Sequence, residues 1–144
     1  MEKLLLDIDI VSAKLAYIIA SLASYSSLDL SKRLNLIVDE LYLIKKSLID
    51  SKQYIDIRNV VAFREDVKAL KDRVKPENEI IFSGHKIACL LFEVSIYFKQ
   101  LNQAIKQEDY QEYMLLASEY TYLAGRLVNK ELLSQEKIII NEGE

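Results

Sequence analysis

Apolar residues recur at intervals of three and four through almost the whole chain, and this spacing restricts the fold more than any other feature. It puts side chains on one face of an α-helix, whereas a half-buried strand alternates at every second residue. Five such stripes follow one another, over residues 4–25, 34–48, 60–74, 87–105 and 113–127. Three Gly and one Pro in 144 residues leave few turn formers for a protein of many short strands. The sequence therefore predicts an all-α fold, an antiparallel bundle of four to five amphipathic helices.

Polar residues between the stripes indicate where the helices begin. Asp29 or Ser31 can cap the second helix, and Asp109 with Glu112 resembles a capping box at the start of the fifth. The fourth stripe is the most regular, so we expect the longest helix there. We assign residues 1–134 to one helical domain and residues 135–144 to a short tail.

Charge and cysteine content indicate a cytoplasmic protein. The formal net charge is −3, which predicts no general attraction to nucleic acid or anionic lipid. Cys89 is the single cysteine and cannot form an intramolecular disulfide. The apolar N-terminal segment is interrupted by Asp7, Asp9 and Lys14, so we expect a buried helix there and no membrane anchor. The abundance of Ile, Leu, Lys, Glu and Tyr is compatible with a thermophilic source such as an archaeon or its virus.

Residues that could carry chemistry are few. His85, Cys89 and Glu93 recur every four residues and would share one helix face, as metal ligands on one helix do. The chain has no other His or Cys, so we interpret them as a helix-capping His and a half-buried thiol. No phosphate loop of the form G-x-x-x-x-G-K-S/T is present. We therefore expect no catalytic residues, no metal, no cofactor and no small-molecule substrate, hence no enzyme.

A basic stripe stands out in the third helix. It consists of Arg64, Lys68, Lys71 and Lys75, and residues 51–75 are the only basic segment of the chain. At the helical rise this row is about 16 Å long and could contact successive phosphates of RNA or DNA. The alternative is that the four residues cover the core with their stems or pair with acids of a neighbouring helix.

Three further sets of residues suggest an interface with another protein. Small residues at helical spacing let a second helix approach closely, and tyrosine is favoured at interfaces. The sets are the alanines Ala13, Ala16, Ala20 and Ala23 of the first helix, the off-stripe tyrosines Tyr110 and Tyr122, and the isoleucines Ile138, Ile139 and Ile140 of the tail.

These sets favour a non-enzymatic interaction protein that self-associates or is a small subunit of a larger complex. The hydrophobic content of 51% supports this hypothesis, because it exceeds what a small monomeric bundle has to bury. The alternative is a nucleic-acid-binding accessory subunit, for example of an RNA-guided defence complex, that uses the basic stripe.

Overall fold

The computed structural model describes residues 1–76 and 80–132, apart from the side chains at positions 57 and 58. It confirms the all-α prediction. The helices are α1 (Glu2–Leu22), the short 3₁₀ helix η1 (Ala23–Leu28), α2 (Ser31–Asp50), α3 (Ile57–Val74), α4 (Lys86–Ala104) and α5 (Glu108–Glu131). None of the helices in the described part is both long and apolar enough to cross a membrane.

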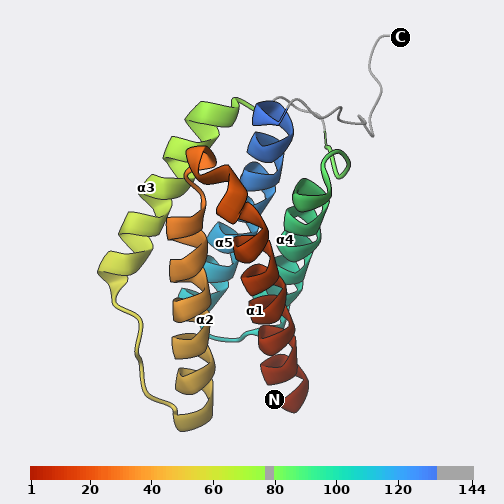
Figure 1. The fold of residues 1–144 in the computed structure, drawn as a ribbon. Helices are drawn as coiled ribbons and strands as arrows, with labels where there is room; N and C mark the ends of the chain where they lie inside the picture. Colours follow the sequence, from red (N-terminus) through yellow and green to blue (C-terminus); the bar gives the residue numbers. More distant parts are fainter. Residues whose placement is uncertain (77–79, 133–144) are drawn as a thin grey trace.

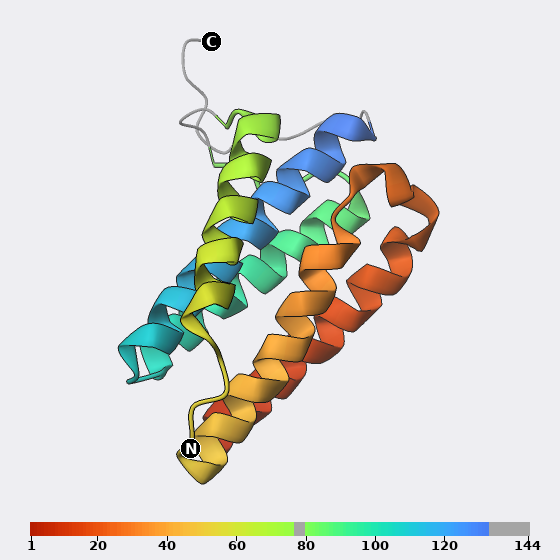
Figure 2. The same cartoon turned by 90° about the vertical axis from the view of Figure 1, so that its left-hand side faces the viewer.

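Successive long helices run in opposite directions, which gives two helical hairpins joined by α3 (Figures 1 and 2). The α1–α2 hairpin packs through α1 against α4, and α5 lies between α4 and α3. The N-terminus, the end of α2 and the α4–α5 connection therefore lie at one end of the bundle (Figure 1). The start of α2 and the end of α3 lie at the other.

The predicted apolar stripes form one continuous core. Each helix turns its stripe inward, because burying apolar area supplies the main favourable free energy of folding. Fully buried members include Val11 of α1, Leu41 of α2, Phe63 of α3, Phe98 of α4 and Leu127 of α5. Most polar residues between the stripes remain on the surface, as expected of amphipathic helices, but Arg33 and Glu40 of α2 are buried.

Several helix boundaries differ from the predictions. α5 has 24 residues and α4 has 19, so the fourth helix is not the longest. Ser31 is the first residue of α2, whose N-cap is Leu30 without a side-chain cap. Asp109 lies inside α5, whose N-cap is Gln107, so the predicted capping box does not form. Acids in a first turn remain favourable next to the helix dipole without capping it.

The start of α4 is fixed by His85 and Asn129. His85 caps the helix by accepting a hydrogen bond from the Ile87 amide at 3.1 Å, which confirms the interpretation of this residue. The Asn129 side chain of α5 accepts from the His85 amide and donates to the Ser83 carbonyl, both at 2.8 Å. Gly84 between them has φ +124°, a conformation that favours glycine. The end of α5 therefore holds the turn that begins α4.

Candidate small-molecule groove

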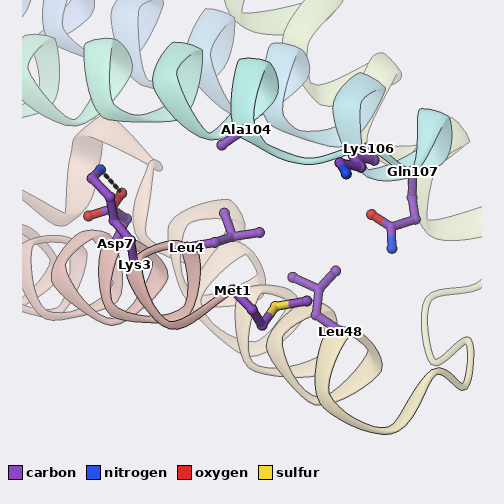
Figure 3. A pocket seen from close by; sticks show the side chains of 8 residues that line it. All are labelled: Met1, Lys3, Leu4, Asp7, Leu48, Ala104, Lys106 and Gln107. Carbon is purple, nitrogen blue, oxygen red and sulfur yellow. Dashed lines mark hydrogen bonds and ion pairs between the residues drawn. The ribbon is translucent and has the colours of Figure 1, made fainter.

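A cavity of about 480 Å³ opens at the end of the bundle that contains the N-terminus. It lies between the first turns of α1, the last turn of α2 and the connection from α4 to α5 (Figure 3). The side chains that line it are Met1, Lys3, Leu4, Asp7, Leu48, Ala104, Lys106 and Gln107.

The cavity has an apolar interior and a polar rim. Leu4 and Leu48 point toward one another across it, with Ala104 on the opposite wall (Figure 3). On the rim, the Lys3 ammonium lies 2.9 Å from the Asp7 carboxylate one turn later, while Lys106 makes no ion pair among the described residues. An apolar cavity with a few polar groups at its edge is the usual form of a small-molecule site.

The α4–α5 connection is tied down at both ends. α4 ends at Ala104 because Ile105 adopts an extended conformation. The Gln111 side chain donates to the Ile105 carbonyl, and Asn102 donates to the Gln111 carbonyl, both at 2.8 Å. The first bond satisfies the carbonyl of the C-cap residue of α4, and the second joins the last turn of α4 to the first turn of α5. Lys106 and Gln107 are thus presented by a fixed segment.

Two smaller hollows continue this cavity toward α3. The first, of about 260 Å³, shares Leu48 and Gln107 with it. The second, of about 140 Å³, shares Gln53, Asp109 and Tyr110 with the first and reaches Ile55 and Val60. We call the three together the end groove. Because neighbouring hollows share lining residues, an elongated or flat ligand could occupy more than one.

The charges of the end groove nearly balance. Lys3, Lys52, Arg64 and Lys106 face three carboxylates, those of Asp7, Asp109 and Glu112. Lys3 pairs with Asp7, and Arg64 pairs with Glu112. Lys52 and Lys106 are the groove cations without an ion pair among the described residues. The groove therefore suits a ligand of low charge better than a polyanion.

The predicted basic stripe lies away from this groove, except for Arg64 at its edge. Arg64 and Lys71 of α3 pair with Glu112 and Glu119 of α5, the latter at 3.8 Å. Lys68 and Lys75 are exposed. Half of the stripe is thus engaged by acids of the adjacent helix, as the alternative interpretation expected.

The predicted interface residues fall in three different environments. Ala13, Ala16 and Ala20 of α1 and Ala23, the first residue of η1, are all exposed. Tyr110, which was expected outside the core, is instead 6% exposed and its hydroxyl hydrogen-bonds to Ser47 of α2. Tyr122 is half-buried, and its hydroxyl accepts from the Ile81 amide at 3.3 Å. Ile138, Ile139 and Ile140, and the predicted domain boundary at residue 134, lie outside the described residues.

His85, Cys89 and Glu93 have separate roles. His85 caps α4, while the Cys89 thiol is half-buried and lies 3.8 Å from the Gly84 carbonyl. Glu93 pairs with Lys14 of α1 at 2.6 Å. The sequence did not identify the end groove, because its walls come from helix ends far apart in the chain.

Comparison with known proteins gives matches only at the level of structure. No family model matches the sequence, and a search of the curated proteins found no match either. Among solved structures, three variants of a PduO-type ATP:corrinoid adenosyltransferase from Lactobacillus reuteri match with TM-scores of 0.81, 0.82 and 0.84. The matches cover 96% of this chain and 82–86% of those chains, at 16% identity. Two of the variants are complexed with cobalamin and ATP, and one with ATP.

These matches correct the functional predictions. The structures that share this fold over nearly the whole chain are enzymes bound to small molecules. The expectations of a non-enzymatic assembly protein, of a nucleic-acid-binding accessory subunit and of a chain without a small-molecule substrate are therefore wrong. The expectation of no enzyme and no substrate rested on missing motifs, whereas the other two rested on the apolar content and on the basic stripe, which describe surfaces and not cavities. At 16% identity the match shows that the two proteins share a fold, and it does not by itself show a shared activity.

Proposed function

We propose that this chain binds a corrinoid in the end groove. The observation that carries the proposal is the match of the whole bundle to adenosyltransferases, two of which hold cobalamin. The end groove supports it independently, because it is a large, mainly apolar hollow formed by four parts of the fold.

The chemistry of the groove suits a corrinoid. A corrinoid is a broad macrocycle with apolar faces and amide groups on its periphery. Leu4, Leu48 and Ala104 offer an apolar surface to a face of the ring. Gln53 and Gln107 at the rim can exchange hydrogen bonds with peripheral amides. Lys3 and Arg64 are paired with Asp7 and Glu112, which lowers the cost of covering these charges with a ligand.

Adenosyl transfer from ATP to the bound corrinoid is a second part of this proposal, because all three similar structures hold ATP. The triphosphate fits the described groove less well than the corrinoid does. Lys52 and Lys106 are its cations without a paired acid, whereas a triphosphate is normally held by a glycine-rich loop and several donors. The two ligands are therefore tested separately.

A visible-absorbance titration with hydroxocobalamin tests the first part. We expect saturable binding to the wild-type protein, weakened at least about tenfold, or about 1.4 kcal/mol, in Ala104→Trp, since the indole would fill the groove. Ala16→Trp places the same side chain on exposed α1 surface and is the matched control. Absence of saturable binding, or equal weakening in both variants, would reject the groove as the corrinoid site.

The transfer reaction is tested by adding ATP and a reductant to the corrinoid complex. We expect the absorbance of adenosylcobalamin to develop with wild-type protein and to be greatly slowed in Ala104→Trp. If the protein binds the corrinoid but forms no product, the proposed transferase activity is rejected and the proposed corrinoid binding is retained. We place this activity in the cytoplasm, where the lone thiol of Cys89 would stay reduced.

A further inference from the structure

A second cavity, of about 290 Å³, lies near the opposite end of the bundle from the end groove. It is lined by the connection from η1 to α2, the first turn of α2, the second half of α3 and one residue of α5. We call it the basic cavity, and its lining residues are Asp29, Lys32, Arg33, Asp66, Ala69, Leu70, Arg73 and Tyr120. Its volume is near the lower limit of roughly 300 Å³ for small-molecule sites, so a ligand there would be small.

Arg33 is the central group of this cavity and is 6% exposed. Its Nε donates to Asp66 Oδ2 at 2.6 Å, its Nη1 lies 3.5 Å from Glu40 Oε1, and its guanidinium stacks 4.6 Å from the Phe63 ring centroid. A guanidinium has five N–H donors, and the donation to Asp66 is the single hydrogen bond that Arg33 makes among the described residues. Because Arg33 lines the cavity, donors that make no hydrogen bond to a described residue can serve a ligand there.

Tyr120 supplies a neutral donor to the same space. The residue is 4% exposed, and its hydroxyl makes no hydrogen bond to another described residue. Burial, and then the charge of Asp66, raise the pKa of the Tyr120 phenol, so it stays protonated. Tyr120 lines the cavity, so its unpaired hydroxyl can donate to an acceptor bound there.

The charge of the basic cavity favours a monoanion. Lys32, Arg33 and Arg73 face the carboxylates of Asp29 and Asp66, an excess of one positive charge on the lining. A dianion would be repelled by the two carboxylates and would leave a net negative cavity. Glu40, whose Oε1 lies 3.5 Å from Arg33 Nη1, is not part of the lining.

We propose that the basic cavity binds a small monocarboxylate, with its carboxylate on Arg33 and Tyr120 and its apolar part against Leu70. Lys32 and Arg73 at the rim add attraction. A carboxylate is planar and accepts two parallel hydrogen bonds from a guanidinium fork. This site is separate from the end groove and does not depend on corrinoid binding.

The test uses two-dimensional ¹H–¹⁵N NMR titrations of the full chain with benzoate, succinate and inorganic phosphate as probes. We expect saturable shifts of cavity residues with benzoate, and weaker binding of succinate and phosphate. Tyr120→Phe removes only the hydroxyl and should weaken benzoate binding about tenfold. Lys32→Gln should weaken it about threefold.

Lys68→Gln is the matched control, because Lys68 is an exposed lysine of α3 outside the cavity lining. Its affinity for benzoate should stay within about twofold of wild type. No saturable binding of any probe, or equal loss in Lys68→Gln and Lys32→Gln, would overturn the proposal. Tighter binding of phosphate than of benzoate would overturn the carboxylate assignment.

Discussion

Gly125 of α5 is where the two most closely packed helices meet, and replacing it with alanine gives a sharp test of the packing. A Cβ atom there would lie 2.8 Å from Cδ1 and 3.0 Å from Cζ of Phe92 in α4, with Cε1 closer still. The Phe92 side chain is 1% exposed and packs against Tyr122, with ring centroids 5.5 Å apart. The ring therefore has little room to move.

Two opposing effects set the size of the change. Overfilling a packed core costs about 1–3 kcal/mol. Alanine in place of glycine inside a helix gains about 1 kcal/mol. We expect Gly125→Ala to lower the free energy of unfolding by about 1 kcal/mol, which corresponds to a fall in Tm of about 2–4 °C for a chain of this size.

A double-mutant cycle measured by urea denaturation separates these two effects. In a Phe92→Leu background the clash is relieved, so Gly125→Ala should be neutral or stabilising, with a coupling of about 1 kcal/mol. If Gly125→Ala stabilises the wild-type chain by the full propensity gain, then α4 and α5 are not in close contact at this position, and the packing argument is refuted.

Two further predictions concern stability. Burial raises the pKa of Glu40 above its ordinary value of 4.5, so the folded chain binds more protons than the unfolded chain above that pH. Stability should fall as pH rises from about 4.5 through the folded pKa, and denaturation of Glu40→Gln across this range should show a shallower fall. Gly84→Ala should lower stability by about 1–3 kcal/mol, because Gly84 has φ +124° and Asn129 occupies the space a Cβ needs; an unchanged Tm would contradict this geometry.

Sequence periodicity was sufficient to predict the fold class and most of the core. Stripe residues such as Val11, Phe63 and Phe98 are buried because helical spacing decides which face is apolar. Helix starts were harder to predict, since Leu30 and Gln107 occupy N-cap positions without the side-chain caps that mark a start in sequence. Tyr110 was misplaced because a residue beside the stripe can still be buried where a third helix covers it.

The binding sites could not be predicted in the same way. The end groove combines Leu4, Leu48 and Ala104, which periodicity cannot bring together because they belong to different helices. The basic cavity left one weak signal, since Arg33 and Glu40 are opposite charges seven residues apart, two turns along the same edge of the α2 stripe. Such a pair beside an apolar stripe indicates buried charge. It does not indicate a ligand, because most of the cavity lining comes from α3 and α5.

Mapping hydroxocobalamin onto the ¹⁵N-labelled protein by NMR tests the central claim most directly. The account predicts shifts that saturate with the ligand and concentrate at the end groove, at Leu4, Leu48, Ala104, Lys106 and Gln107. Residues at the opposite end, around Gly84, should stay unchanged. Saturable shifts centred on that opposite end, or no shifts with excess ligand, would contradict the assignment of the end groove as a corrinoid site.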